Sequence, residues 1–346
     1  MFFETVQQQT HLLIQQMLQN QTVTRPTVIL GFSGGPDSVF LFHVLKDLHH
    51  AQHMHLITAH LDHGWRASSA GDATFCLTTS ASYEIPCVVA KAEMFEGMVK
   101  DRGSKEDFGR SLRRLFFQQT LQKYTAHCIA LAHHLQDQEE TFFLRLLRGA
   151  SLSGLRCMEP IDGHYIRPLL ALNKRDILQF LNDNNHAYCT DPTNDSDEFL
   201  RNKIRKYVIP ALTKCDDRFD HKFQTTLALL KQEDDFLQEV THKAFEQIFI
   251  FDEKLMHHKG NLRLLQTHNL TLQQRIILHW LITEKAQFSL STSFLQEIMR
   301  FLASPHGGSH HIGTLFTIHK KHNTLWIEQE ITQPYRKKEV NEARRS

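Results

Sequence analysis

The segment Ser33–Ser38, which reads Ser-Gly-Gly-Pro-Asp-Ser, combines residue types that can hold the phosphates of a nucleotide. The apolar run before it, Thr27–Gly31, predicts a buried strand, and the apolar run from Val39 predicts a buried helix. A helix N-terminus leaves backbone N–H groups unpaired and favours negative charge. Glycines let the backbone approach a ligand closely, and the serine hydroxyls are further donors. The segment therefore predicts a site for the pyrophosphate end of a nucleotide.

Two other phosphate-binding patterns do not occur in this sequence. A Walker A loop ends in Gly-Lys-Ser or Gly-Lys-Thr, and the chain contains no Gly-Lys pair. A dinucleotide fingerprint needs Gly-x-Gly-x-x-Gly, and no Gly-x-Gly occurs. The order Ser-Gly-Gly-x-Asp-Ser instead resembles the PP-loop of the ATP pyrophosphatases, which cleave ATP between the α and β phosphates. The alternative is a plain turn between a strand and a helix, but the flanking apolar elements favour the nucleotide site.

Strand-like and helix-like segments alternate before residue 150. This alternation predicts an α/β fold with a doubly wound, mostly parallel sheet, in which ligands bind at the carboxyl edge of the strands. An amphipathic helix over residues 5–20 precedes the first strand. The predicted strands are Val28–Gly31, Leu56–Leu61, Val88–Ala90 and Cys128–Ala132, and the predicted helices are 37–48, 68–82, 105–122 and 135–148.

The pattern becomes mainly helical beyond Gly154. We expect a first domain over residues 1–215 and a second over 216–346, because Pro210 and a charged stretch separate the two parts. The second domain should be mainly helical and end in a small β-hairpin within residues 313–327. The helices predicted in this half are 173–185, 197–208, 217–249, 272–283 and 292–302.

The composition of the chain argues against several classes of protein. No apolar run is long enough to span a membrane, and the first residues lack the basic and apolar regions of a signal peptide. The six cysteines form no Cys-x-x-Cys pair, which indicates a reducing compartment. We therefore expect a cytoplasmic protein that does not bind membranes. The net charge of +1 gives no general signal for nucleic acid, although basic residues cluster at 102–114 and 201–206.

Four more polar segments accompany the predicted strands and helices. Residues 60–66 close the second strand with the order His-x-Asp-His-x-x-Arg, and residues 106–113 place Glu, Gly and two arginines on a helix. Residues 133–149 begin with His-His-x-x-Asp-x-x-Glu-Thr and end in Arg-Gly. The turn 191–194 is followed by the Arg-Asn-x-x-Arg of residues 201–205. Each of these segments, taken alone, could be a solvated helix face. Several of them follow predicted strands in this order, however, and that arrangement favours a single shared site.

The ordered set resembles the tRNA(Ile)-lysidine synthetase family of PP-loop enzymes. The resemblance is close over about residues 25–215 and looser beyond them. Asp62 stands where many members have Asn, and Gly109 stands where Ala is usual. Gly109 should weaken its helix by about 1 kcal/mol relative to Ala. Neither departure threatens the assignment to this family.

The resemblance implies an ATP-dependent ligase that modifies RNA. ATP, bound with Mg²⁺, would activate carbon-2 of the wobble cytidine in the CAU anticodon of an isoleucine tRNA as an adenylated intermediate. The ε-amine of L-lysine would then displace AMP. The product, lysidine, pairs with A instead of G and converts codon and amino-acid specificity from methionine to isoleucine. The second domain would contact the tRNA. The sequence leaves the oligomeric state open, with a homodimer as one option.

The same resemblance implies roles for individual residues. Those implied to bind ATP are Ser33, Gly34, Gly35, Pro36, Asp37, Ser38, His60, Arg110 and Arg113. Those implied in the chemistry are Asp37, which would also hold Mg²⁺, together with His133, Asp137 and Glu140. Those implied to bind lysine or tRNA are Asp137, Glu140, Arg148, Arg201 and Arg205. The sequence does not assign each arginine to ATP or RNA, or decide which carboxylate serves lysine.

Three other functions compete with this one. A tRNA 2-thiolation enzyme of the same superfamily would need cysteines for a cluster or persulfide, and the lack of Cys-x-x-Cys argues against the cluster-bearing type. An NAD or GMP synthetase would use a small-molecule acceptor and would not depend on tRNA. A catalytically inactive RNA-binding module would not need an intact phosphate loop.

Overall fold

The computed structural model divides the chain into two compact units, residues 1–230 and 231–346. The helix α10 (Phe219–Ile248) runs through this division, whereas the predicted boundary at residue 215 precedes the helix. Arg66 and residues 191–194 of the predicted motifs lie outside the described residues. The described ranges are 1–19, 23–65, 69–99, 105–190, 199–254, 256–288, 291–313 and 315–329, with only the backbone of 105, 106 and 292.

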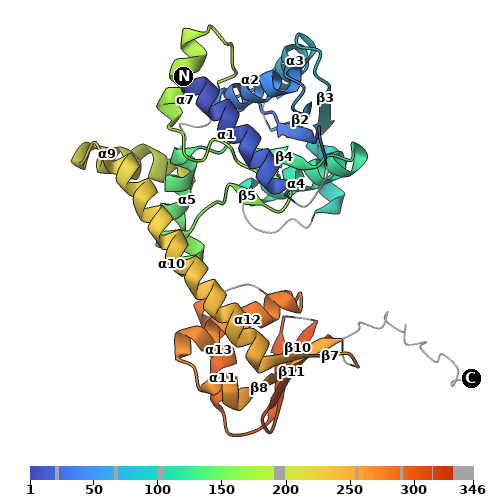
Figure 1. The fold of residues 1–346 in the computed structure, drawn as a ribbon, viewed down its shortest axis with the longest axis vertical. Helices are drawn as coiled ribbons and strands as arrows, with labels where there is room; N and C mark the ends of the chain where they lie inside the picture. The colour runs from blue at the N-terminus through green and yellow to red at the C-terminus, as the bar shows by residue number, and fades with distance from the viewer. Residues whose placement is uncertain are drawn as a thin grey trace, which may run out of the picture. The chain divides into compact units, whose positions relative to one another are not determined.

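Within the described ranges, six strands form the sheet at the centre of the first unit, in the order β3-β2-β1-β4-β6-β5 (Figure 1). Neighbouring strands are parallel, except for the short antiparallel pair β5–β6. The chain order reverses at β1, which is where doubly wound sheets bind ligands. The predicted α/β fold is confirmed. The strands are β1 (Thr27–Gly31), β2 (His55–Asp62), β3 (Cys87–Lys91), β4 (Cys128–Ala130), β5 (Ile161–Asp162) and β6 (Tyr165–Ile166).

Helices and apolar side chains cover both faces of this sheet. Val28 and Leu30 on β1 join the core that contains α1, α2 and α7, whereas Ile29 joins the core beneath α4. This alternation follows from the two-residue period of a strand, and both faces are apolar because helices cover both. The helices are α1 (Phe2–Met17), α2 (Pro36–His50), α3 (Ser69–Ala81), α4 (Lys105–Lys123), α5 (Leu135–Leu147), α6 (Leu152–Leu155) and α7 (Lys174–Asp183), with 3₁₀ turns at Ala92–Met94 and Glu96–Met98.

A helical extension follows, and it contains an irregular turn. α8 (Leu200–Lys203) continues into a π-helical turn, Ile204–Val208, and then into α9 (Ile209–Cys215). The expected break at Pro210 does not interrupt this path. Pro210 lies in the first turn of α9, where its missing N–H costs little. Single π turns are frequent at functional sites, and this one carries Arg205.

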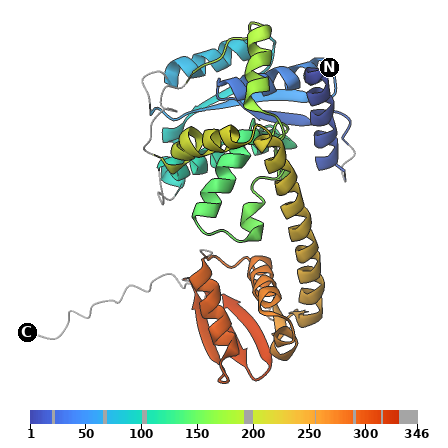
Figure 2. The same cartoon turned by 90° about the vertical axis from the view of Figure 1, so that its left-hand side faces the viewer.

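The second unit packs helices against an antiparallel sheet (Figure 2). The predicted hairpin is present as β10 and β11, but three further strands complete a sheet in the order β7-β8-β11-β10-β9. β8 reads His-His-Lys-Gly-Asn and β9 reads Gly-Ser-His-His-Ile, so Ile312 is the one residue of the two strands that is β-branched, the type typical of strands. The elements are β7 (Phe249–Asp252), β8 (His257–Asn261), α11 (Leu262–Gln266), α12 (Leu270–Thr283), α13 (Thr292–Ala303), β9 (Gly308–Ile312), β10 (Phe316–Lys321) and β11 (Thr324–Gln329).

Two buried charges of the second unit have partners inside it. Asp234 on α10 is fully buried and accepts a hydrogen bond from Arg275 on α12, with Oδ1 and Nη2 2.6 Å apart. Lys320 donates from Nζ to the carbonyl oxygens of Phe301 and Ser304, each at 2.6 Å, at the C-terminus of α13. A cation is favourable there because helix C-termini carry unpaired carbonyls. Both interactions tie helices to the rest of the unit.

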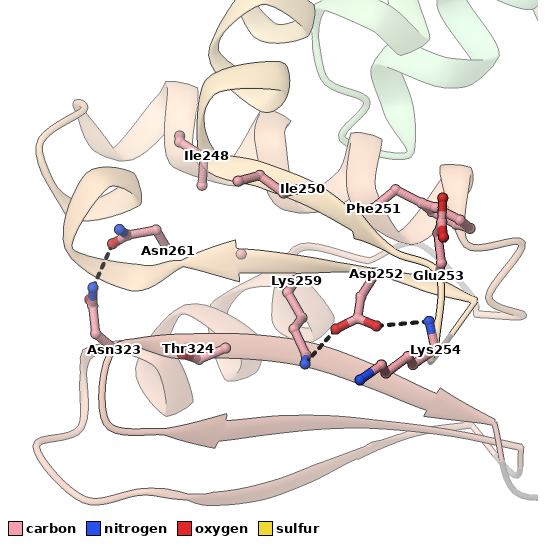
Figure 3. A pocket seen from close by; sticks show the side chains of 11 residues that line it. Ile248, Ile250, Phe251, Asp252, Glu253, Lys254, Lys259, Asn261, Asn323 and Thr324 are labelled. Carbon is pink, nitrogen blue, oxygen red and sulfur yellow. Dashed lines mark hydrogen bonds and ion pairs between the residues drawn. The ribbon is translucent and has the colours of Figure 1, made fainter.

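The opposite face of this sheet carries polar and aromatic side chains. The rings of His319 and Trp326 stack, with their centroids 5.2 Å apart, on paired positions of β10 and β11. Figure 3 shows a hollow lined by residues of β7, β8 and the β10–β11 turn. Lys259 pairs with Asp252 there at 2.6 Å, and Ile250 is 73% exposed. Over the part of the chain that is described, none of the helices is long and apolar enough to cross a membrane.

Candidate active site

The phosphate loop lies between β1 and α2, at the carboxyl end of a central strand. Gly34 has a φ of +81°, a conformation that favours glycine. A Cβ at this position would also lie 3.2 to 3.4 Å from side-chain atoms of Phe75, Cys189 and Cys76. Gly35 follows as the N-cap of α2. The two glycines therefore serve a tight turn that packed side chains enclose from one side.

Hydroxyl groups brace this turn. Ser33 Oγ donates to Ser38 Oγ at 3.1 Å, and Ser38 Oγ donates to the Gly35 carbonyl at 2.9 Å. The Gly35 N–H donates in turn to Ser33 Oγ at 3.4 Å. Pro36 occupies the first turn of α2, where a proline is preorganised for the helix. The loop is thus held in shape before any phosphate binds, and the N-terminus of α2 favours an anion there.

A series of ionisable side chains extends from the loop. Asp37 Oδ2 lies 3.2 Å from Lys174 Nζ on α7 and 3.6 Å from His134 Nε2. His134 Nε2 lies 3.5 Å from Asp137 Oδ2, and Asp137 Oδ1 lies 3.7 Å from Arg201 Nη2. The elements that supply these groups are α2, α7, the start of α5 and α8. Lys174 belongs to this series of side chains, although no motif in the sequence includes it.

Glu140 is 1% exposed and binds two guanidinium groups. Arg201 Nε donates to Oε2 at 2.7 Å, while Arg205 donates from Nε to Oε1 at 2.5 Å and from Nη2 to Oε2 at 3.0 Å. Burial alone would lower the pKa of Arg205, but its hydrogen bond to Glu140 raises that pKa above the ordinary value. Both carboxylate oxygens of Glu140 therefore have cationic partners.

His133, two residues before α5, and Asp137, in its first turn, differ in protonation state. Burial raises the pKa of Asp137, but His134, His133, a backbone N–H and Arg201 together bring it below its usual value. The backbone N–H that lowers this pKa belongs to His134 and lies 3.0 Å from Asp137 Oδ2. Burial lowers the pKa of His133 to about 4, against the opposing effect of Asp137. At neutral pH the site therefore combines an ionised carboxylate with a neutral imidazole.

Three other residues predicted to bind ATP lie on β2 and α4. His60 is buried at the end of β2, and its Nδ1 is 2.9 Å from the carbonyl oxygen of Phe32, directly before the loop. Arg110 and Arg113 are exposed on α4. Arg110 lies close enough to His133 to lower its pKa. The structure thus brings His60 and Arg110 toward the site.

Arg148 is placed differently from the other predicted residues. It forms the C-terminal cap of α5, whose first turn carries Asp137. At 1.5 Å per residue, the two Cα atoms are separated by about 16 Å along the helix axis. Arg148 therefore lies away from the phosphate loop, and any contact that it makes with RNA would be at a separate point.

Trp65 explains the glycine on α4. The Trp65 ring lies tilted against that of His63, with centroids 4.6 Å apart. A Cβ at Gly109 would lie 2.5 Å from Trp65 Cη2. Ala at this position would require the indole to move, so the close approach of the ring accounts for glycine in this helix.

Asp37 is suited to a magnesium ion that is shared with phosphates. Its Oδ1 is buried and has no hydrogen-bond partner among the described residues. In the same part of the chain, no group of three His, Cys, Asp or Glu side chains could hold a metal ion alone. Mg²⁺ in nucleotide sites commonly takes one or two carboxylates and completes its shell with phosphate oxygens and water. The donor set therefore fits Mg²⁺ that arrives with a nucleotide.

The loop, the switch point of the sheet and this charge pattern define a PP-loop protein. Residues 5–212 match the PP-loop domain family, and the chain belongs to it. Membership implies that the protein uses ATP. Of the solved structures, the U34-tRNA thiolase NcsA from Methanococcus maripaludis with its 4Fe-4S cluster has a TM-score of 0.53 at 17% identity, over 66% of this chain and 80% of that one. This likeness concerns the fold alone.

The similar curated proteins carry one name. The chain is 33% identical over 235 residues to the tRNA(Ile)-lysidine synthase of Bacillus subtilis (strain 168), which covers 66% of this chain and 49% of that protein. It is 28% identical over 324 residues to the tRNA(Ile)-lysidine synthase of Bacillus thuringiensis subsp. konkukian (strain 97-27), which covers 90% and 67%. The first alignment thus spans about half of its relative's length.

Proposed function

We propose that this protein ligates L-lysine to carbon-2 of the wobble cytidine in the CAU anticodon of an isoleucine tRNA, using ATP and Mg²⁺. The observation that supports this most is the convergence of the phosphate loop with Asp37, His134, Asp137 and Arg201 at one edge of the sheet. The names of the similar curated proteins agree with it. A tRNA substrate would place the reaction in the cytoplasm.

In the first half-reaction, the loop binds the pyrophosphate end of ATP. The carbonyl oxygen at carbon-2 of cytidine attacks the α-phosphate, the bond to the bridging oxygen breaks, and pyrophosphate leaves with that electron pair. Ser33 and the N-terminus of α2 would face the negative charge that develops on the departing pyrophosphate. Hydrogen-bond donors that are already in place stabilise such charge in the transition state. Asp37 would hold Mg²⁺, which supplies positive charge to the phosphates when bound.

In the second half-reaction, the ε-amine of lysine attacks carbon-2 and AMP leaves. We assign the lysine ammonium to Asp137, because that carboxylate is ionised and its guanidinium neighbour, Arg201 Nη2, is 3.7 Å away. Glu140 has both oxygens bound to Arg201 and Arg205, so its role is to position these guanidinium groups. The neutral His133 can accept a proton or hydrogen bond from the amine before attack.

The two units would contact different parts of the tRNA. A wobble base is single-stranded, so it can be splayed into a pocket beside the loop. The first unit, residues 1–230, would carry the chemistry, and the second unit, residues 231–346, would contact the body of the tRNA. The stacked His319–Trp326 pair and the neighbouring Lys259 and Lys321 offer aromatic and cationic groups for such contacts.

One assay separates this function from its competitors. The protein is incubated with ATP, labelled lysine and total tRNA, and acid-insoluble label is measured, with methionine tRNA as the substrate control. We expect label in isoleucine tRNA, and none with the Asp37→Ala variant. Label that appears in a small molecule without tRNA would instead identify an amide-forming ligase. ATP cleavage that depends on tRNA but incorporates no lysine would point to a different tRNA modification.

A further inference from the structure

We propose that Lys174 binds the β- and γ-phosphates of ATP and stays on the pyrophosphate as it leaves. This rests on the proposed function only in that ATP is cleaved between its α and β phosphates. In the structure, the Lys174 ammonium lies 3.2 Å from Asp37 Oδ2. Asp37 belongs to the first turn of α2, which follows the phosphate loop directly. The ammonium is therefore within a few ångströms of the place where phosphates bind.

The backbone of Lys174 is anchored from several directions. Its N–H donates to Gln136 Oε1 at 2.9 Å, and the N–H of Leu135 donates to the Leu172 carbonyl at 2.9 Å. Asn173 caps α7 by accepting the Arg175 N–H at 2.9 Å, and its amide also donates to Asp220. These bonds fix the start of α7 against α5 and α10. A side chain supported in this way is held in position to meet a ligand.

The packing of α7 fixes its position relative to α2. Ile177 and Leu181 on α7 are fully buried in the same core as Phe40 on α2. The Phe180 ring also meets the edge of the Phe40 ring, with centroids 5.1 Å apart. The Lys174 side chain nevertheless remains 40% exposed, so a ligand can reach its ammonium. The fold thus holds one cation at the loop without burying it.

The charges predict an exchange of partners on nucleotide binding. Before ATP binds, Lys174 neutralises Asp37. A triphosphate carries more negative charge than one carboxylate, so it attracts the ammonium more strongly, and lysine binds phosphates well as a point charge. When the ammonium moves to the phosphates, Asp37 is released to face the accompanying Mg²⁺. The lysine thereby contacts the leaving group, on which negative charge develops.

Equilibrium binding of ATP, inorganic pyrophosphate and AMP to the full chain tests this assignment. With Lys174→Met, we expect the Kd of ATP and of pyrophosphate to rise about 10- to 100-fold, since a hydrogen bond to a charged group is lost. The Kd of AMP should stay within about twofold, because AMP lacks the phosphates concerned. Lys174→Arg should recover part of the affinity. Arg175→Met is the matched control, because that side chain is 82% exposed and pairs with Asp176 outside the site.

Two results would overturn the assignment. Equal weakening of AMP and pyrophosphate in Lys174→Met would indicate a general distortion of the site, and unchanged pyrophosphate binding would show that the lysine does not contact the leaving group. If Lys174→Met does not fold, as judged by its melting curve, the same comparison with Lys174→Gln decides the question. Wild-type protein that binds ATP and pyrophosphate as expected but attaches no lysine to tRNA would refute the proposed function and leave this assignment standing.

Discussion

Asp37 in the first unit and Asp234 in the second are both carboxylates beside a cation, yet their surroundings differ. Asp234 is 0% exposed, and its two oxygens accept from Arg275 at 2.6 Å and from Gln238 at 2.8 Å. Asp37 is 24% exposed, and its buried Oδ1 has no partner among the described residues. An unpaired buried group costs free energy, whereas a paired one contributes to folding.

The same contrast holds for other buried ionisable groups. In the described part of the first unit, His133 Nδ1, His134 Nδ1 and both oxygens of Glu139 are buried without a partner. In the second unit, Glu284 accepts from two histidine rings, and Lys320 donates to carbonyls at the end of α13. The charges near the phosphate loop are therefore arranged for a ligand, and those of the second unit are arranged for stability.

The largest effect should come from Asp37→Ala. We expect lysine attachment to fall about 1,000-fold, which corresponds to about 4 kcal/mol, because the variant loses the carboxylate for Mg²⁺ and the partner of Lys174. The melting temperature should change little, since Asp37 has an unpaired oxygen and contributes little to folding. Initial rates of lysine incorporation and a melting curve measure both. Normal activity in a folded Asp37→Ala protein would remove the phosphate loop from the mechanism.

Arg275→Met should have the opposite effect to Asp37→Ala, lowering the stability of the protein without weakening ATP binding. It leaves Asp234 buried without its cation, which typically costs about 3 kcal/mol of folding free energy. We expect denaturation of the second unit at lower urea concentration and unchanged affinity for ATP. Lys243→Met is the control, because that lysine is 67% exposed and pairs with Glu239 on the surface of α10. A loss of ATP affinity in Arg275→Met would mean that the second unit's buried charges also serve the nucleotide.

Local signals in the sequence were enough to predict part of the site. β1, the phosphate loop and α2 are adjacent in the chain, so their apolar runs and glycines indicated both the elements and the chemistry. Lys174 gave no such signal, because its contact with Asp37 joins residues 137 positions apart. The hydrogen bond from Arg205 to Glu140, 65 positions away, could not be predicted for the same reason. Long-range contacts depend on packing that no local pattern encodes.

The second unit was harder to predict for a different reason. β8 and β9 are rich in histidine and glycine, so their composition does not favour strands. Packing determines their conformation instead. Gly260 on β8 lies against the Phe249 ring, where a Cβ would be 2.5 Å from a ring carbon. The strand therefore depends on a close approach that only the folded structure reveals.

Glu139→Gln should raise stability in a pH-dependent way. Burial, aided by Asp220 and Glu140, raises the pKa of Glu139 to about 8 in the folded protein. The folded state therefore holds a proton that the unfolded chain has released, and the free energy of unfolding falls as pH rises from about 4.5 toward 8. Gln has the shape of the protonated acid and does not ionise. We expect the gain in the free energy of unfolding to be about 3 kcal/mol larger at pH 8 than at pH 5, from about 1.4 kcal/mol per pKa unit.

Urea denaturation at both pH values measures this difference. Glu246→Gln serves as the control, since that carboxylate is 63% exposed on α10 and should give no pH-dependent gain. An equal effect of Glu139→Gln at pH 5 and pH 8 would show that the carboxyl finds a partner at high pH. In that case the first unit would resemble the second in satisfying its buried charges, and the contrast between them would be confined to the phosphate loop.

The smallest effect concerns tRNA affinity, where exposed cations of both units should contribute alike. Each lysine or arginine that neutralises a phosphate adds about 0.7 to 0.9 to the slope of log K against log salt. We expect Arg205→Gln and Lys321→Gln each to reduce the slope by about that amount. Arg205→Gln should also lower the rate of lysine attachment, because it disturbs Glu140, whereas Lys321→Gln should leave the rate with saturating tRNA unchanged.

Titrations with tRNA at several salt concentrations measure these slopes. Lys243→Gln serves as the control. It should keep the wild-type slope, because that lysine pairs with Glu239 on its own helix. If Lys321→Gln keeps the wild-type slope, the outer face of the second sheet does not contact phosphates, and another surface of that unit must hold the tRNA. If Lys321→Gln lowers the attachment rate even at saturating tRNA, a surface side chain of the second unit influences the chemistry. The separation between a unit that reacts and a unit that binds would then be wrong.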